Sequence, residues 1–225
     1  MPIFKKKNED FFKTWSPKMA YVLGFFAADG NMMKSKRGNH YISFYSCDRD
    51  IIESIKVLMD CEHKIYSKPL RYKHHKPCYQ IQIGSKEIFN DLVKLGFTPN
   101  KSLTIKFPNI PEAYLRDFIR GYFDGDGHAS TGFYIRKDRS SKIPKHILFT
   151  GFTSGSRSFL KSLHDILKRD KIVNGGTLYF QKGHRLNFSS QDSLRLYDFL
   201  YKGLKNSLYL ARKKKVFEKY IKLRA

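Results

Sequence analysis

Hydrophobic and polar residues alternate in several short segments of the chain. Residues 41–46 have the sequence Tyr-Ile-Ser-Phe-Tyr-Ser, and residues 80–83 have the sequence Gln-Ile-Gln-Ile. A period of two is typical of a strand with one face on the core and the other exposed. A further strand pair is predicted over residues 179–188, with its turn at Lys182 and Gly183. These segments predict sheets whose two faces differ in chemistry.

Helices are predicted between the strands. Asp48 or Asp50 is placed to cap one helix, which would run from Ile51 to Met59, and Ser156 or Ser158 is placed to cap another. Each half of the chain then has the order helix, two strands, helix, two strands, helix. This order predicts an α+β fold of antiparallel sheets that carry helices on one face only. Other helix starts are expected at Ser16, Ser85, Asn109 and Gln191.

The chain contains one internal repeat. Residues 22–30, Val-Leu-Gly-Phe-Phe-Ala-Ala-Asp-Gly, are similar to residues 119–127, Ile-Arg-Gly-Tyr-Phe-Asp-Gly-Asp-Gly. Three matches in the same order predict two copies of one structural unit. The other two matches pair residues 44–52 with 152–160 and residues 81–89 with 186–194.

The linker between the copies is predicted at residues 107–111, Phe-Pro-Asn-Ile-Pro, because two nearby prolines end regular structure. The first copy would cover residues 1–106 and the second residues 112–225. With 225 residues, the chain is long enough for one large domain or for two small ones, each with its own core.

The charge of the chain favours a polyanionic partner. There are 43 Lys and Arg residues against 20 Asp and Glu residues, which gives a net charge of +23. Such a surplus repels itself unless an anion compensates it, so nucleic acid is the first candidate and an anionic membrane surface the second. No apolar run approaches the roughly 18 residues of a spanning helix, and no signal core follows the charged N-terminus. We therefore expect a soluble intracellular protein, in the cytoplasm or in an organelle, that does not bind membranes.

The three cysteines, Cys47, Cys61 and Cys78, are far apart in the sequence and form no CxxC pair. We expect three reduced thiols, with neither a disulfide framework nor a zinc site.

Small residues in the two motif segments predict a close helix contact. Gly24 and Ala28 are four residues apart, as are Gly121 and Gly125, so each pair lies on one helix face. If these faces pack together, Asp29 and the equivalent Asp126 come together at the helix ends. Two close carboxylates repel each other unless a cation lies between them, and a hard divalent cation such as Mg²⁺ suits oxygen ligands and phosphate. The alternative is that each Asp-Gly only ends a helix in a tight turn.

Both motif segments resemble the signature of the LAGLIDADG homing endonucleases, in the single-chain form with two motifs. The resemblance implies two αββαββα halves related by a pseudo-twofold axis, which form a saddle of antiparallel sheets over double-stranded DNA in a monomer. It implies that Asp29 and Asp126 bind the metal, and we expect Ala28 and Gly125 beside them to contribute. Mg²⁺ or Mn²⁺ would support cleavage, and Ca²⁺ would occupy the site without supporting it. One departure is Ala27, where the second motif has Asp124 and the family has aspartate.

Members of this family often have a lysine near each acid. Lys101 is the candidate in the first repeat and Lys213 in the second, with Arg212 and Lys214 as rivals. Such a lysine would help to activate water or to stabilise the transition state. The alternative is an ordinary solvated basic stretch.

Basic, aromatic and amide side chains gather in and around the predicted strands. Lysine and arginine in turns suit phosphates, whereas arginine, glutamine and asparagine on a strand face suit base edges. The candidate DNA contacts in the first repeat are Lys34, Lys36, Arg37, His40, Tyr41, Ser43, Tyr45, Lys68, Arg71, Tyr72, Lys73, Gln80 and Gln82. Those in the second are Tyr134, Arg136, Lys137, Arg139, Lys142, Lys145, Tyr179, Gln181, Lys182, His184, Arg185 and Asn187.

The resemblance implies a homing endonuclease, of the kind associated with intron homing, that hydrolyses one phosphodiester in each strand of a long, imperfectly symmetric DNA site. The alternative is a catalytically silent relative that acts as a DNA-binding regulator or as an RNA-splicing maturase on the same scaffold. Loss of a motif acid would favour that alternative, and neither acid is lost.

Overall fold

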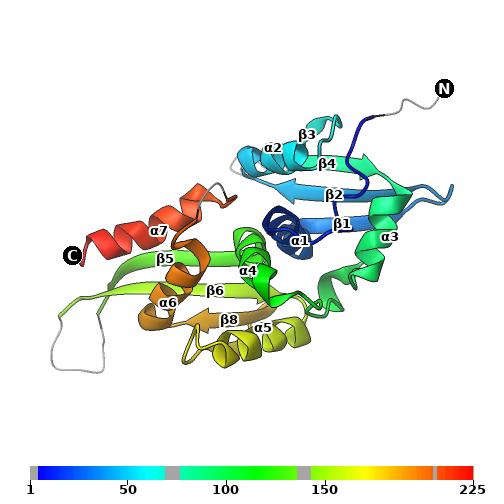
Figure 1. Ribbon diagram of the computed structural model, residues 1–225. Helices are drawn as coiled ribbons and strands as arrows, with labels where there is room; N and C mark the ends of the chain where they lie inside the picture. The colour runs from blue at the N-terminus through cyan, green and yellow to red at the C-terminus, as the bar shows by residue number, and fades with distance from the viewer. Residues whose placement is uncertain (1–4, 69–76, 136–142, 205–206, 225) are drawn as a thin grey trace. The chain divides into compact units, whose positions relative to one another are not determined.

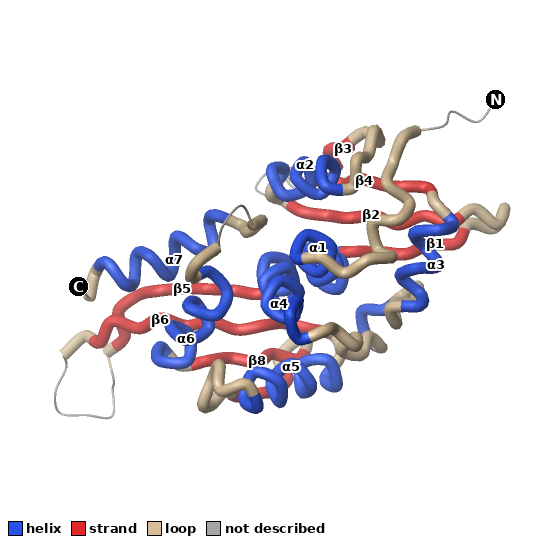
Figure 2. Tube along the Cα trace, viewed as in Figure 1, coloured by secondary structure: helices blue, strands red, loops and turns tan. Residues whose placement is uncertain are grey.

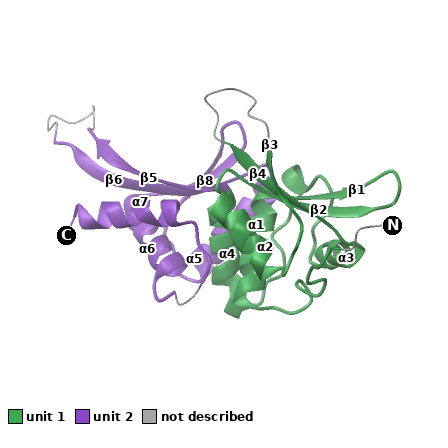
Figure 3. Cartoon of the chain, turned by 90° about the horizontal axis from the view of Figure 1, so that it is seen from above, with its two compact units in different colours: residues 1–125 green, residues 126–225 purple. Residues whose placement is uncertain are grey.

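The computed structural model describes residues 5–68, 77–135, 143–204 and 207–224, although the side chain of Lys68 is not described (Figure 1). Contacts divide the chain into two compact units, residues 1–125 and residues 126–225 (Figure 3). This boundary is defined by contacts within the fold. The predicted linker at residues 107–111 is instead a boundary between the two sequence repeats, so it stays a prediction.

The first unit contains one four-stranded antiparallel sheet in the order β1-β2-β4-β3. Its elements follow the predicted order of one repeat, and a short 3₁₀ helix and a further α-helix come after it. They are α1 (Pro17–Asp29), β1 (Gly30–Lys34), β2 (His40–Ser46), α2 (Arg49–Leu58), β3 (Ile65–Lys68), β4 (Cys78–Gly84), α3 (Lys86–Lys94), η1 (Lys101–Leu103) and α4 (Glu112–Asp126).

The second unit has a sheet of the same topology, with the order β5-β6-β8-β7. Because α4 precedes β5, the order helix, two strands, helix, two strands, helix occurs twice in the chain, as predicted. The elements are β5 (Gly127–Tyr134), β6 (Lys145–Ser154), α5 (Arg157–Arg169), β7 (Thr177–Phe180), β8 (His184–Phe188), α6 (Ser190–Tyr201) and α7 (Ala211–Lys222).

Serine side chains begin several of the helices. Ser16 Oγ accepts a hydrogen bond from the Met19 backbone N–H at 3.1 Å, and Ser156 Oγ accepts one from Phe159 at 3.3 Å. Each bond satisfies a backbone donor that has no partner within the helix. The expectation for α2 was less accurate. Asp48 is its N-cap residue but makes no side-chain capping bond, and the helix begins at Arg49 rather than at residue 51.

The alternation in the strands places hydrophobic residues on one face of each sheet. Ile42 pairs with Ile83 and Phe44 with Ile81, and all four side chains are fully buried. Phe26 of α1 packs edge-on against Phe44, and α2 and α3 contact β4 and β2. In the second unit, α5, α6 and α7 contact the strands of the other sheet. The prediction of antiparallel sheets with helices on one face is therefore confirmed.

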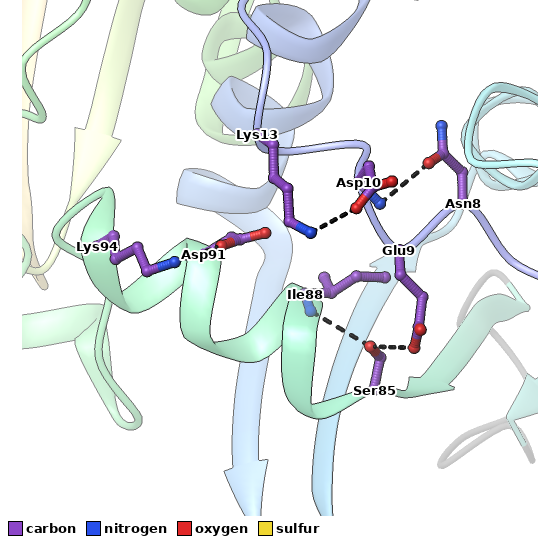
Figure 4. A network of polar contacts seen from close by, with 8 residues as sticks. All are labelled: Asn8, Glu9, Asp10, Lys13, Ser85, Ile88, Asp91 and Lys94. Carbon is purple, nitrogen blue, oxygen red and sulfur yellow. Dashed lines mark hydrogen bonds and ion pairs between the residues drawn. The ribbon is translucent and has the colours of Figure 1, made fainter.

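The segment before α1 is attached to the start of α3 by polar contacts (Figure 4). The Ser85 hydroxyl donates a hydrogen bond to Glu9 Oε1 at 2.8 Å and accepts one from the Ile88 backbone N–H at 3.2 Å. The same hydroxyl therefore caps α3 and also holds the N-terminal segment against the start of this helix. This hydrogen bond is the main cause that lowers the pKa of Glu9 below its ordinary value.

A buried carboxylate connects the start of α6 to the loop before β7. Asp192 is 6% exposed, and it accepts hydrogen bonds from the backbone N–H groups of Asn174 and Gly175 and from Arg195 Nη1, each at 2.9 Å. Burial raises the pKa of Asp192, but the three donors outweigh burial and hold this pKa below its ordinary value.

Candidate active site

The helices α1 and α4 pack side by side through their glycines (Figure 2). A Cβ atom added to Gly24 would lie 2.0 Å from the Phe118 carbonyl oxygen, and one added to Gly121 would lie 2.0 Å from the Tyr21 carbonyl oxygen. No real side chain fits at these distances, so the two backbones are in direct contact. The predicted small-residue contact is present, and it explains why glycine is accepted in helices, where it costs about 1 kcal/mol.

The same contact continues to the ends of the two helices. A Cβ atom on Gly125 would lie 2.3 Å from the Ala28 Cβ and 3.2 Å from Asp29 Oδ2. The Asp29 carboxylate therefore lies against the residue that immediately precedes Asp126 in the chain. A side chain at residue 125 would displace this carboxylate, so the small residue there keeps space beside it.

The Asp-Gly pairs do not form tight turns with a left-handed glycine. Asp29 ends α1 and Gly30 begins β1 directly, with an extended backbone at φ −89° and ψ 153°. Glycine is needed at residue 30 because a Cβ there would lie 2.4 Å from the Phe26 carbonyl oxygen. The tight-turn alternative is therefore wrong for the first motif. In the second motif, α4 likewise ends at Asp126 and the next residue begins β5.

The departure at Ala27 has a physical explanation in the helix contact. Asp124, which is equivalent to Ala27 in the repeat, is 2% exposed and accepts a hydrogen bond of 2.6 Å from the Tyr21 hydroxyl. The residue equivalent to Tyr21 is Phe118, which has no hydroxyl group. Asp124 of the second motif therefore has a hydroxyl donor in Tyr21. At the equivalent pair of positions, Ala27 has no carboxylate and Phe118 has no hydroxyl. A buried acid without a donor would be costly, so alanine at residue 27 fits phenylalanine at residue 118.

Both predicted lysines are buried next to the motif ends. Lys101 is 5% exposed, and its Nζ donates a hydrogen bond to the Ala27 carbonyl at 2.9 Å. Lys213 is 4% exposed, and its Nζ donates to the Gly127 carbonyl at 2.6 Å. The alternative of a solvated basic stretch is therefore wrong for these two residues. The rivals lie elsewhere, since Arg212 is exposed and Lys214 forms an ion pair with Glu218 on the same helix.

The outer face of the first sheet, opposite the helices, carries most of the predicted strand contacts. In the strand register, Tyr45 and Tyr66 both lie beside Gln80, and Ser43 lies beside Gln82. Tyr41 is on the same face by alternation. Ser43 is only 3% exposed, however, so we leave it out of the proposed contact surface.

The outer face of the second sheet is similar in chemistry. Tyr134 pairs with Lys145 and Tyr179 with Arg185, and all four lie on the face away from the helices. Asn187 is on this face but is 8% exposed, with its Nδ2 bonded to the Tyr179 hydroxyl at 2.6 Å, so we leave it out as well. Aromatic and cationic groups therefore dominate this surface.

Two histidines expected on the DNA-binding surface lie on the opposite face. His40 shares the face of Ile42, and its ring packs edge-on against Phe89 of α3 at 4.7 Å. His184 is two residues from Leu186 in β8, on the helix-covered face, and its ring packs against Phe180. The alternation of the strands decides both cases, and it removes both residues from the proposed surface.

The remaining predicted contacts lie in turns or outside the described residues. Lys34 is exposed at the end of β1, Lys36 and Arg37 are exposed in the turn that follows, and Gln181 and Lys182 are exposed in the turn between β7 and β8. Seven candidates fall outside the described residues, as does the side chain of Lys68. They are Arg71, Tyr72, Lys73, Arg136, Lys137, Arg139 and Lys142.

Sequence reasoning missed His128, which follows the second motif directly. Its ring lies on the outer face of β5, 5.5 Å from the ring of Phe149. Burial, together with the charges of Arg185 and Lys213, holds the pKa of His128 below its ordinary value. The sequence signal was its position two residues after Asp126. In a strand that starts at Gly127, residue 128 lies close to the motif acid and its side chain points to one face of the sheet.

Metal binding at the helix ends would rely on oxygen atoms. Among the described residues, no group of three or more His, Cys, Asp or Glu side chains is placed to hold a metal ion. One carboxylate per motif plus backbone carbonyls is a hard donor set, which suits Mg²⁺ or Ca²⁺ when water and phosphate complete the shell. The residues present fit such an ion.

Solved structures of DNA-binding nucleases have the same fold. The LAGLIDADG meganuclease I-AabMI, bound to uncleaved DNA, matches with a TM-score of 0.63 and 15% identity over 93% of this chain and 90% of that one. The homing endonuclease I-WcaI, bound to its DNA recognition sequence, matches with a TM-score of 0.61 and 14% identity over 93% and 91%. I-SmaMI, bound to an uncleaved DNA target with calcium ions, matches with a TM-score of 0.59 and 13% identity over 93% and 90%.

Residues 16–95 match the family described as LAGLIDADG-like domain. The chain has the LAGLIDADG fold. The resemblance predicted from the motifs is therefore confirmed. The uncharacterized protein MJ0398 of Methanocaldococcus jannaschii is 24% identical to this chain, over 96% of this chain and 78% of that protein.

No helix among the described residues of this chain is both long and apolar enough to cross a bilayer.

Proposed function

We propose that this protein is a site-specific endonuclease that hydrolyses one phosphodiester in each strand of double-stranded DNA. The observation that carries the proposal is the packing of α1 on α4, which sets the Asp29 carboxylate against Gly125, the neighbour of Asp126. A helix contact made only for stability needs no acid at its end. Here the acid ends each of two equivalent helices, and a buried lysine contacts the backbone beside it in each repeat.

A divalent cation is the cofactor that fits this proposal. Asp29 and Asp126 would hold it, with the backbone at Ala28 and Gly125 as further oxygen donors. When bound, Mg²⁺ or Mn²⁺ would help to activate water and would neutralise charge that develops on the phosphate. The I-SmaMI complex with uncleaved DNA and calcium ions supports a divalent ion at such a site.

The lysines would place positive charge next to each phosphate. Burying an ammonium group costs several kcal/mol, so the burial of Lys101 and Lys213 calls for a compensating role. Their hydrogen bonds to Ala27 and Gly127 fix the two charges close to the motif acids. A fixed charge of this kind stabilises an oxyanion without reorganisation during the reaction.

The outer sheet faces would bind the duplex. Tyr45, Gln80 and Gln82 on one sheet and Tyr179 and Arg185 on the other offer the aromatic, amide and guanidinium groups that read base edges. The net charge of +23 supplies the attraction to phosphate. DNA bound to I-AabMI and I-WcaI supports this partner.

The test begins with selection of cleaved sites from a randomised duplex library in Mg²⁺. The purified protein should cut both strands of the selected site. Asp126→Asn should abolish cutting and leave binding within a few-fold, because the amide keeps the shape and loses the charge that holds the cation. The control is Asp165→Asn, since Asp165 is exposed and paired with Lys161 far from the motif in the sequence.

Two outcomes would overturn the proposal. Cleavage by Asp126→Asn at the rate of the parent protein would remove this acid from the reaction. Tight binding of a selected duplex without cleavage in either Mg²⁺ or Mn²⁺ would instead favour the catalytically silent DNA-binding regulator.

A further inference from the structure

Two cysteines that are distant in the sequence lie opposite each other at one end of the first sheet. The antiparallel register of β2 and β4 ends with Ser46 opposite Tyr79. Cys47 directly follows β2 and Cys78 is the first residue of β4, so the register continued by one residue puts Cys47 opposite Cys78. By alternation both side chains project to the outer face, which they share with Tyr45 and Gln80.

The distance between opposed strand residues matches the needs of a disulfide. Directly opposed residues in an antiparallel pair have Cα atoms about 4.5 or 5.5 Å apart, depending on the kind of pair. Disulfides span Cα distances of about 4.4 to 6.8 Å, so either kind of pair is close enough. The thiols already interact, because the hydrogen bond with Cys78 is the main cause that raises the pKa of Cys47 to about 11. A disulfide can therefore form without a rearrangement of the strands.

The third cysteine provides an internal comparison. Cys61 is 6% exposed, and its sulfur lies 3.0 Å from His63 Nδ1, a partner only two residues away. Cys47 is exposed and Cys78 is half-buried. An oxidant from solvent therefore reaches the cross-strand pair and not Cys61.

We propose that Cys47 and Cys78 are an oxidation site that closes to a reversible disulfide in the presence of a hydroperoxide. The Cys78 thiolate attacks the peroxide oxygen and becomes a sulfenic acid, and the leaving hydroxide takes up the proton that the Cys78 thiol released, which gives water. Cys47 keeps its proton during this step. The neighbouring thiol then attacks the sulfenic sulfur and releases a second water, so two thiols and one hydrogen peroxide give one disulfide and two waters.

A disulfide between Cys47 and Cys78 would affect the outer face of the first sheet. The cross-link would join the end of β2 to the start of β4, next to the Tyr45 and Gln80 side chains. Asp29 is close enough for its charge to raise the pKa of Cys47, so the pair also lies near the motif acid. The modification would therefore fix the surface beside Asp29, and its formation does not depend on the proposed nuclease activity.

The test uses the full-length protein, reduced and then treated with hydrogen peroxide. Intact mass should fall by about 2 Da as two hydrogens are lost, and dithiothreitol should reverse the change. Alkylation of the denatured protein should then modify one of its three cysteines instead of all three. Peptide mapping should find the fragment with Cys47 linked to the one with Cys78.

Single cysteine variants distinguish a Cys47–Cys78 disulfide from a disulfide that involves Cys61. Cys61→Ala should lose the two hydrogens as the parent does, whereas Cys47→Ser and Cys78→Ser should gain oxygen at the remaining thiol instead. The proposal is overturned if the peroxide-treated parent keeps three alkylatable thiols, if mapping links Cys61 to either partner, or if the product is a cross-linked dimer. Mapping on the parent decides the pairing even where a variant fails to fold.

Discussion

Replacing Gly121 by alanine tests the helix contact on which the candidate site rests. The added methyl group would lie 2.0 Å from the Tyr21 carbonyl oxygen and 2.9 Å from the Phe25 backbone nitrogen. Because real Cβ atoms essentially never come closer than 3.0 Å to such atoms, α1 and α4 must separate by about 1 Å. Backbone atoms cannot rotate away as a side-chain end can, so the clash is relieved only by moving a whole helix.

The magnitude follows from two opposing effects. Overpacking of a well-packed contact costs about 1 to 3 kcal/mol, and a clash with backbone belongs at the upper end of this range. Alanine regains about 1 kcal/mol through its higher helix propensity. The expected net loss in the free energy of unfolding is therefore about 2 kcal/mol, which lowers Tm by about 4 to 8 °C in a chain of this size.

Thermal and urea unfolding of the two proteins measure this difference. The matched control is Gly132→Ala in β5, where an added Cβ meets nothing within 4 Å, and it should change the stability by less than about 0.5 kcal/mol. Gly121→Ala should also weaken Mn²⁺ binding, because separation of the helices moves Asp29 away from Gly125. A Gly121→Ala protein as stable as the parent would refute the close helix contact.

Three further outcomes are expected. Lys213→Met should slow cleavage of the selected site about a hundredfold in a plasmid nicking assay, with Lys215→Met as the exposed control, because a buried cation that faces developing charge is lost. Tyr21→Phe should reduce the free energy of unfolding by about 1 to 3 kcal/mol, since the buried Asp124 loses the hydrogen bond from the Tyr21 hydroxyl, and equal stability in urea would contradict this. Asp192→Asn should destabilise the protein at pH 7. The lowered pKa of Asp192 gives stability that is present above about pH 3.9 and lost as the pH falls through the folded value, so the difference between the two proteins should shrink below pH 4.

The element order and the sheet faces could be predicted because they depend on local patterns. The alternation around Ile42 and Phe44 fixed which side chains face the core, and the structure has the same assignment. The small residues at Gly24 and Gly121 predicted a helix contact, since glycine inside a helix needs a packing reason. These features are decided within a few residues of chain.

The features that could not be predicted depend on partners distant in the sequence. His40 was expected on the DNA-binding surface from its charge class, although the alternation with Ile42 and Phe44 puts it on the core face. Its packing against Phe89 of α3 is the part that the sequence does not show. The pairing of Tyr21 with Asp124 crosses two helices, so neither residue alone indicates it. The contact between Cys47 and Cys78 is a third case, because the sequence does not show that the strands next to these residues are neighbours.

The position of Lys101 was predicted only through the family resemblance. The composition around Lys101 does not distinguish a buried lysine from one on a solvated surface. The Lys101 side chain is buried because η1 lies against the end of α1, where its Nζ reaches the Ala27 carbonyl. Lys213 is similar, because it is one of three consecutive lysines and only its position on α7 turns it inward. Helical geometry selects one lysine of the three, and the sequence alone does not say which.

The central claim is that Asp29 and Asp126 together hold the divalent cation at the scissile phosphates. The most direct measurement is the anomalous scattering of Mn²⁺ in crystals of the protein with its selected duplex. The account predicts manganese peaks within bonding distance of the carboxylates of both residues, about 2.0 to 2.2 Å from oxygen, and contacts from the same ions to phosphate of the DNA. Manganese bound elsewhere, or carboxylates of Asp29 and Asp126 that contact no metal in the complex, would contradict it.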